Sequence, residues 1–387
     1  VYHVLSKPHV IIPKGNVVVF TRPQSPIAQQ LQVETSGGPT IAVRDNPADP
    51  YGKALIFVGA NEEELLAAAR VLAGGQLKAT GNTAVVASSA QLPARKPYDA
   101  PRWLRSGGLI RLLDNPASEQ YRVYGDGEAQ VFFRLAPDLH FDAETSVPLV
   151  VAVDVANLGA AQATVPVRLN GQVLGTILLN AADVGKTVTR TFVAPASSLY
   201  PRNTLSIEFS YRGSTSGAAV PMGRVLDGTK IDLRGIPHFV RMPRLDLFAK
   251  AGFPFTQMAD LSTTAFVLPT QPTRGQIATF LEAAAFLSAQ TGYPALRLTV
   301  QGSQDAAKSN RDLLIIGSAA DHSLLAMGTA KMPVDIGGSS WRLNGGGSWF
   351  TRLWDEPFLN PPAGEDAVRA QLATTSDRDV LIQGFAH

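Results

Sequence analysis

Residues 164–179 read TVPVRLNGQVLGTILL, and this stretch decides how the middle of the chain folds. Apolar and polar side chains alternate up to Asn170, which is the pattern of a half-buried β-strand. Asn170-Gly171 is a residue pair typical of two-residue hairpin turns, because both positions tolerate a positive φ. A second apolar run follows at once. The stretch therefore predicts two antiparallel strands joined by a tight turn.

The surrounding sequence repeats this strand pattern from about residue 103 to about residue 240. No helix-length amphipathic stretch interrupts it, and turn residues separate the runs. Six segments are strand-like, at residues 130–135, 149–155, 164–169, 173–179, 187–193 and 204–211. Many short strands with frequent turns are typical of an antiparallel sandwich or a jelly roll, so we expect one of these two folds here.

The sequence before the sandwich changes to a mixed α/β pattern. Residues 10–12, 16–20 and 54–59 are short apolar runs, which predict strands. A helical pattern over residues 61–72 follows, with Asn61 as the expected N-cap. Because a fully apolar strand leads directly into a helix, we expect a parallel sheet that is covered on both faces.

The α/β pattern returns after the sandwich. Residues 264–268, 296–300 and 312–317 predict strands, and residues 275–291 predict a helix. The order of elements is similar to that of the first segment, so two related α/β domains flank one sandwich. The expected domain boundaries are residues 1–98, 99–243 and 244–387.

Composition excludes several classes of function. The 387 residues carry a formal net charge of +2 and no long basic run, so the electrostatic pattern of a nucleic-acid-binding protein is missing. Cysteine is absent, which excludes disulfides, a thiolate nucleophile and a cysteine metal site. No apolar run reaches the roughly 18 residues that a membrane helix needs.

The search for catalytic motifs is also negative. The six histidines are scattered without metal-binding spacing, and neither a G-x-S-x-G elbow nor a P-loop is present. His238 lies in an apolar setting, where a structural histidine is the more frequent case. No pair of carboxylates stands out for glycoside hydrolysis. We therefore expect no enzyme activity, no catalytic residue, no cofactor and no metal.

Carbohydrate binding is better supported by the sequence. Sandwich domains frequently bind sugars through aromatic rings that stack on pyranose faces, with polar neighbours that bind the hydroxyl groups. Core packing remains the more frequent role of any single ring. The candidates for contact with a glucan are Trp103, which is favoured because it lies at a domain junction, with Arg102, Tyr121, Tyr124 and Tyr200.

One part of the chain is similar to a known family. The sequence reads DLRGIPHF at 232–239, MPRLDLFA at 242–249 and GFPFTQMADLS at 252–262. Residues 46–53 and 289–294 agree as well. These stretches lie in order along the chain, and together they resemble the B subunit of bacterial cellulose synthase.

The resemblance implies a more specific fold. Members of that family alternate jelly-roll carbohydrate-binding domains with flavodoxin-like domains. This chain would then hold a partial flavodoxin-like domain, one jelly-roll sandwich and a second flavodoxin-like domain that is truncated at its C-terminus. A C-terminal membrane anchor would lie outside this chain, and the protein would reside in the periplasm in association with the inner membrane.

The resemblance also implies a function and partners. The chain would belong to a non-catalytic subunit that caps the membrane-embedded catalytic subunit and guides the nascent β-1,4-glucan chain through the periplasm. Polymerisation itself would belong to the partner. Some family members are labelled as cyclic di-GMP-binding, but this sequence shows no arginine-rich signature of the kind that such receptors use.

Two other hypotheses remain open from the sequence. The first is a free-standing carbohydrate-binding or carbohydrate-active module that acts on β-glucans. The second is a structural assembly protein that self-associates through surfaces of low charge, since only 17% of the residues are charged. Turnover of cello-oligosaccharides would support the first of these, and concentration-dependent light scattering would support the second.

Overall fold

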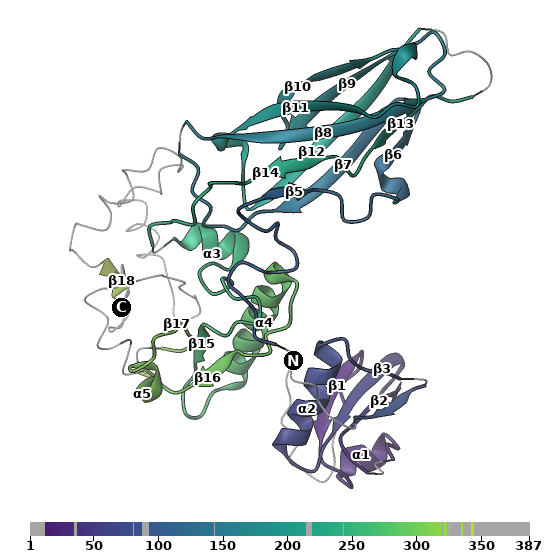
Figure 1. The fold of residues 1–387 in the computed structure, drawn as a ribbon. Coiled ribbons are helices and arrows are strands. Elements are labelled where there is room, and N and C mark those ends of the chain that lie inside the picture. Colours follow the sequence, from purple (N-terminus) through teal and green to yellow (C-terminus); the bar gives the residue numbers. More distant parts are fainter. Residues whose placement is uncertain are drawn as a thin grey trace.

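The chain forms a first α/β region, a long β-sandwich and a second α/β region, in that order (Figure 1). The structure is a computed structural model. It describes residues 12–34, 37–79, 81–86, 93–142, 144–213, 219–242, 244–318, 320–322, 325, 334–335 and 342–343.

The first region is built on a mixed sheet of order β1-β3-β2-β4. Its elements are β1 (Val17–Thr21), α1 (Pro26–Gln30), β2 (Thr40–Asn46), β3 (Asp49–Val58), α2 (Glu62–Ala73) and β4 (Thr83–Val85). Strands β1 and β3 are parallel, but β2 runs antiparallel to both β3 and β4. The two predicted strands therefore pair in parallel as expected, but the sheet as a whole is mixed. Only two residues join β2 to β3, which allows a hairpin but no crossover.

Both faces of this sheet are covered, as predicted. Helix α2 packs on one face, where Phe57 of β3 lies with Ala68 and Val71. Helix α1 packs on the other face, where Ile56 lies with Ile27. Asn61 caps α2 as expected, because its Oδ1 accepts a hydrogen bond from the Glu64 N–H at 2.9 Å. Of the predicted strand at 10–12, the first two residues lie outside the described residues.

All six predicted strands of the sandwich are present. The elements of the sandwich are β5 (Leu109–Arg111), β6 (Arg122–Tyr124), β7 (Gly127–Arg134), β8 (Ser146–Ala156), β9 (Gln162–Leu169), β10 (Gln172–Leu179), β11 (Val188–Pro195), β12 (Arg202–Arg212), β13 (Met222–Val225) and β14 (Lys230–Asp232). The hairpin of β9 and β10 turns at Asn170 and Gly171, which have φ values of 51° and 86°. The sequence pattern did not predict the short strands β5, β6, β13 and β14.

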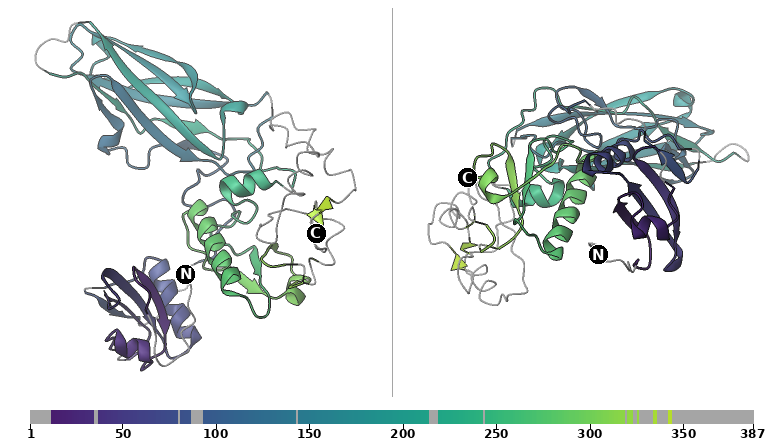
Figure 2. Two further views of the ribbon diagram at one scale, coloured as in Figure 1. Left: turned by 180° about the vertical axis from the view of Figure 1, so that it is seen from behind. Right: turned by 90° about the horizontal axis from the view of Figure 1, so that it is seen from below.

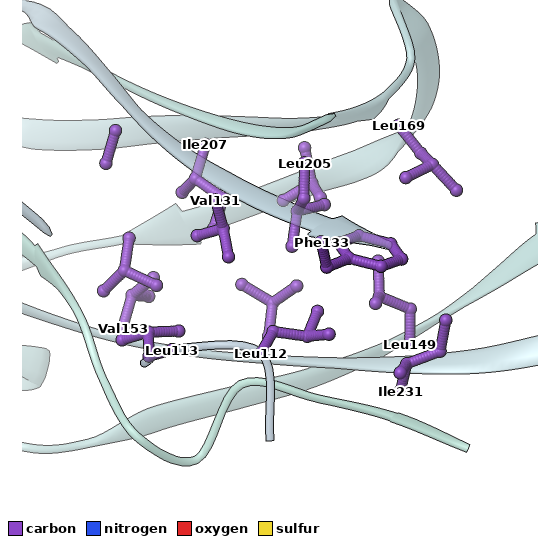
Figure 3. Close-up of a cluster of buried hydrophobic side chains, with 14 of the residues drawn as sticks. Leu112, Leu113, Val131, Phe133, Leu149, Val153, Leu169, Leu205, Ile207 and Ile231 are labelled. Carbon is purple, nitrogen blue, oxygen red and sulfur yellow. The ribbon is translucent and has the colours of Figure 1, made fainter. Parts of the chain in front are cut away.

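Two antiparallel sheets enclose the core of the sandwich. One has the order β10-β9-β12-β7. In the other, β8 pairs with β11 along one edge and with β13 and β14 along the other. Alternate residues of each strand point inward, so Val131, Leu205 and Leu149 meet between the sheets (Figure 3). Burial of this continuous apolar layer is the main source of stability for the domain.

The second α/β region contains a parallel sheet of order β16-β15-β17. Its elements are α3 (Leu245–Ala251), β15 (Thr264–Val267), α4 (Arg274–Thr291), β16 (Thr299–Gln301), α5 (Ser303–Ala306) and β17 (Asp312–Ile315), and a short pair follows in β18 (Val334–Asp335) and β19 (Arg342–Leu343). The predicted strands and helix are confirmed, although β16 begins three residues late. A Thr273 capping box starts α4, and left-handed Gly292 ends it.

The segment that precedes the sandwich makes hydrogen bonds to the second α/β region and so connects that region to one end of the sandwich. The Arg95 N–H donates to Asp260 Oδ2 at 3.1 Å, and the Arg102 N–H donates to the Thr291 carbonyl at 3.1 Å. The C-terminal end of α4 therefore lies beside one end of the sandwich, where α3 also lies (Figure 1; Figure 2 gives two further views). In the part of the chain that the structure describes, no helix is long and apolar enough to cross a membrane.

Candidate functional site

A groove of about 460 Å³ lies where the end of the sandwich meets α3. One wall comes from the loop after β7 and from the loop before β12. The other wall comes from residues 239–241 and from α3. The polar and aromatic side chains of its lining are His140, Phe141, Asp142, Ser197, Tyr200, Phe239, Arg241, Arg244, Asp246 and Lys250.

Aromatic rings line the groove from both walls. The side chain of Tyr200 is 51% exposed on the sandwich wall, and that of Phe239 is 60% exposed on the opposite wall. The His140 ring meets the Phe239 ring edge-to-face, with centroids 5.5 Å apart. Rings that remain this exposed in a groove can offer an apolar face to a ligand.

Charged side chains lie beside these rings. Arg244 binds Asp246 through two hydrogen bonds of 2.8 and 2.9 Å, in a bidentate pair. Burial alone would raise the pKa of Asp246, but the hydrogen bond and charge of Arg244, with the charge of Lys250, outweigh it and hold the pKa below its usual value. The carboxylate therefore stays ionised at neutral pH and can accept hydrogen bonds.

The pKa of a carboxylate on the sandwich wall, that of Asp142, is lowered for a different reason. Asp142 accepts a hydrogen bond from the Thr145 hydroxyl, which is the main reason why its pKa is lowered. Backbone N–H groups of Thr145 and Glu144 lower its pKa further. The groove thus combines apolar rings with ionised acceptors and cationic donors, which is the combination that binds the faces and hydroxyl groups of a sugar.

Two short segments hold the walls of the groove together. Leu139 and His238 form an isolated antiparallel bridge. The Phe239 N–H donates to the Asp138 carbonyl at 2.8 Å, and the His140 N–H donates to the Pro237 carbonyl at 2.9 Å. His140 and Phe239 meet on the groove side of this bridge, while His238 makes its contacts elsewhere.

His238 belongs to a chain of polar contacts that resembles a catalytic triad. Its Nδ1 lies 3.0 Å from Asp138 Oδ1, and its Nε2 lies 2.7 Å from Ser106 Oγ. Since a carboxylate anion only accepts hydrogen bonds, Nδ1 carries the proton, and in the neutral tautomer Nε2 accepts from the Ser106 hydroxyl. Tyr98 Oη donates to the second oxygen of Asp138 at 2.6 Å, and its ring stacks on the imidazole at 3.7 Å.

We interpret this chain of contacts as a structural joint. Neither Ser106 nor His238 lines the groove. Gln257 of the second α/β region donates to the Tyr98 hydroxyl at 2.8 Å, so the contacts run from that region through Tyr98 to Asp138 of the sandwich. The expectation of a structural role for His238 agrees with this arrangement.

Two of the sequence candidates for sugar contact are buried. Trp103 is 6% exposed and Tyr121 is 4% exposed, and both belong to the apolar core of the sandwich. A ring buried to this extent offers little surface to a sugar, which argues against Trp103 as a glucan contact. Its segment contacts the second α/β region, but its ring belongs to the apolar core.

The other three candidates do not line one groove. Only Tyr200 lines the groove. Tyr124 is 61% exposed on the outer face of the other sheet, directly opposite Met222. Arg102 donates from Nη1 to the Ala289 carbonyl at 2.7 Å, at the end of α4. The structure therefore does not bring the five candidates together into one site.

Phe239, Arg241 and Arg244 line the groove but were not predicted from the sequence as site residues. All three lie in the stretch that carries the family resemblance, but a single exposed ring between prolines and arginines gives no periodic signal. Their proximity to Tyr200 depends on the docking of α3 against the sandwich. Among the described residues, no group of three or more His, Asp or Glu side chains is placed to hold a metal ion.

Models of one protein family match the chain in three consecutive segments. Residues 7–86 match the first FD domain of cellulose synthase BcsB, and residues 108–223 match its second CBM domain. Residues 238–386 match the second FD domain of the same protein. The matched order is the order of the first α/β region, the sandwich and the second α/β region.

Curated relatives agree with these family models. A cyclic di-GMP-binding protein of Pseudomonas fluorescens (strain SBW25) is 29% identical over 84% of this chain and 46% of its own length. A protein of the same name from Xanthomonas axonopodis pv. citri (strain 306) is 30% identical over 96% of this chain and 51% of its own length.

Among solved structures, a family 35 carbohydrate-binding module from an environmental isolate covers 34% of this chain and 90% of its own, at 14% identity and a TM-score of 0.19. The chain spans about half the length of the curated relatives. Because all three segments match one protein in order, the chain belongs to the cellulose synthase BcsB family.

Proposed function

We propose that the chain is part of a non-catalytic periplasmic subunit of a cellulose synthase complex. In this role it caps the membrane-embedded glycosyltransferase and guides the nascent β-1,4-glucan chain through the periplasm. Its partners are the catalytic subunit and the growing glucan, and the subunit is associated with the inner membrane. The match of three consecutive segments to one cellulose synthase protein supports this proposal over a free-standing module.

The groove between the sandwich and α3 is the observation that carries the proposal. Tyr200 and Phe239 are exposed rings on the two walls, and Asp142, Asp246 and Arg241 belong to the same lining. A glucan chain has apolar ring faces and equatorial hydroxyl groups, so it can stack on the rings and bind the charged groups by hydrogen bonds. Tyr124 on the outer face of the sandwich is a separate candidate contact for the same polymer.

The finer description of the fold is part of this proposal. We assign residues 1–98 to a partial flavodoxin-like domain, residues 99–243 to a jelly-roll carbohydrate-binding domain and residues 244–387 to a second flavodoxin-like domain. The β16-β15-β17 order of the second region supports its assignment, since a parallel sheet of order 2-1-3 is the start of such a fold. The mixed sheet of the first region supports its assignment less well.

Incubation with cellohexaose separates a guiding subunit from a carbohydrate-active enzyme. The chain is mixed with cellohexaose for a day, and the products are separated by chromatography. We expect binding without any change in oligosaccharide length, because a guiding surface holds the polymer without cleaving it. Shorter or longer products that depend on the protein would contradict the proposal.

Co-purification tests the proposed partner. The full-length protein that contains this chain is purified from membranes in mild detergent, and the associated proteins are identified by mass spectrometry. We expect a membrane-embedded glycosyltransferase in stoichiometric amount. A complex that lacks any glycosyltransferase would overturn the assignment, and a species that contains only this protein would favour the self-assembly hypothesis.

A further inference from the structure

Three arginines that are distant in sequence gather around the C-terminal end of α4. Arg102 comes from the segment before the sandwich, Arg134 ends β7 and Arg202 begins β12. Arg134 and Arg202 are directly opposite each other in the antiparallel pair of β7 and β12. Because the three arginines are far apart in sequence, the sequence shows no arginine-rich signature, although the folded chain forms an arginine cluster.

Only neutral acceptors bind these guanidinium groups in the structure. Arg202 Nη2 donates to Gln290 Oε1 at 2.7 Å, and Arg134 Nη1 donates to Gln290 Oε1 and to the Gln290 carbonyl, both at 3.3 Å. Arg102 Nη1 donates to the Ala289 carbonyl at 2.7 Å. Among the described residues, no ion pair includes any of the three arginines.

The positive charge of the cluster is therefore poorly compensated. The end of a helix contributes only about −0.5 of an elementary charge, so the cluster keeps an excess of roughly +2.5. Partial burial lowers the pKa of Arg134, and the charges of Arg202 and Arg102 lower it further. Like charges that face each other across strands are unfavourable. Such an arrangement is stabilised when an anion binds to it.

The cluster has the donors and the access that an anion needs. A guanidinium group carries five N–H donors, and the contacts above use a single nitrogen of each arginine. Arg102 and Arg202 are exposed to solvent, and Arg134 is half-buried between them and α4. The buried Gln290 side chain fixes Arg134 and Arg202 in place from the inner side.

We propose that Arg102, Arg134 and Arg202 form a binding site for a phosphate group. A phosphate group carries about −1.5 to −2 charges and three strong acceptor oxygens, which matches three guanidinium groups better than a carboxylate does. The site connects the sandwich to the second α/β region, so the bound anion stiffens the contact between them. The phosphate comes from a free phosphate ion, a nucleotide or a lipid headgroup.

The test is a calorimetric titration of the 387-residue chain with sodium phosphate, against sodium chloride at matched ionic strength. We expect saturable binding that chloride does not reproduce. Arg202→Gln should weaken it about tenfold or more, because one charge-assisted pair is lost. Arg212→Gln is the control, since Arg212 lies at the other end of β12 and is exposed.

Gln290→Glu distinguishes a site that binds an anion from arginines that only cap the C-terminal end of α4. The new carboxylate would bind Arg134 and Arg202 from the position of Gln290 Oε1. It should abolish phosphate binding while it raises the thermal unfolding midpoint. If the parent chain shows no phosphate-specific binding, or if Gln290→Glu and Arg202→Gln bind phosphate as the parent does, the proposal is overturned.

Competition identifies the source of the phosphate group. Cyclic di-GMP and vesicles that contain phosphatidylglycerol are each added to the phosphate-bound chain. Displacement by cyclic di-GMP indicates a nucleotide, and displacement by the vesicles indicates a lipid headgroup. Phosphate binding that resists both competitors indicates the free ion. Each of these results supports the site and names its ligand.

Discussion

The hydroxyl of Tyr98 donates a hydrogen bond of 2.6 Å to the carboxylate of Asp138. Tyr98 precedes the sandwich, and Asp138 belongs to the loop whose next residues line the groove. The Asp138 carbonyl also accepts a hydrogen bond from the Phe239 N–H. Asp138 therefore holds both Tyr98, at the contact with the second α/β region, and Phe239, whose ring lines the groove. The position of the groove thus depends on a buried polar contact that lies behind it.

Stability at high pH should depend on Tyr98. Burial, and then the hydrogen bond to Asp138, raise the pKa of Tyr98 to about 12, whereas an unfolded tyrosine ionises near pH 10. Between these values the unfolded chain releases a proton that the folded chain keeps. The free energy of unfolding is therefore unaffected below about pH 10 and falls as the pH rises toward 12.

Tyr98→Phe removes this group, so its unfolding free energy should fall less steeply over that range. Urea unfolding at intervals from pH 9 to pH 11.5 measures the slope. Tyr51→Phe is the control, because the Tyr51 side chain is 93% exposed. Equal slopes for the parent and Tyr98→Phe would show that Tyr98 ionises alike in both states.

Trp103→Ala should act on stability and not on glucan binding. The ring is buried in the sandwich core, and truncation of a buried tryptophan costs about 3–5 kcal/mol. Chemical unfolding measures the loss of free energy. Tyr124→Ala, at an exposed ring, should change the same quantity by only about 0.5 kcal/mol. A small effect of Trp103→Ala on stability, with a loss of cellohexaose binding, would restore the sequence-based interpretation.

Gly223→Ala should destabilise the sandwich. A Cβ atom on Gly223 of β13 would clash with the ring of Phe209, which is fully buried on the facing sheet. Overpacking of this kind costs about 1–3 kcal/mol. The midpoint of thermal unfolding should fall accordingly. Gly302→Ala is the control because its Cβ would meet open space, and an equal shift for both variants would refute the packing argument.

Ser106 should not react as a nucleophile. Its partner His238 is covered on one face by Tyr98, and neither residue lines the groove. We expect no labelling of the chain by a fluorophosphonate probe, as detected by intact-protein mass spectrometry. A mass increase that Ser106→Ala abolishes would show that the three residues work as a triad, and would contradict the structural interpretation.

The fold could be predicted wherever the local pattern is strong. The alternation around Asn170-Gly171 predicts a hairpin correctly, because register and turn are encoded within a few residues. Strand β2 was missed, since Arg44 and Asp45 interrupt its apolar run. Its hairpin with β3 makes the first sheet mixed, so one missed strand changed the expected topology of the whole region.

The site could be predicted much less well, because it depends on contacts between distant segments. Exposure decides whether a ring binds a ligand, and sequence does not distinguish buried Trp103 from exposed Tyr200. Phe239 and Tyr200 line the same groove from separate segments, and the pairing of Leu139 with His238 brings the Phe239 segment to the sandwich. The arginine cluster is a similar case, since its members approach each other only in the folded chain.

Calorimetric titration with cellohexaose tests the central claim most directly. The ligand is titrated into the parent chain, into the Tyr200→Ala Phe239→Ala double variant and into Tyr51→Ala as the matched control. Burial of one aromatic ring contributes roughly 1.5–3 kcal/mol, so loss of both rings should weaken binding at least a hundredfold. Tyr51→Ala should bind as the parent does. Equal affinity of the parent and the double variant would contradict the assignment of the groove as the glucan site.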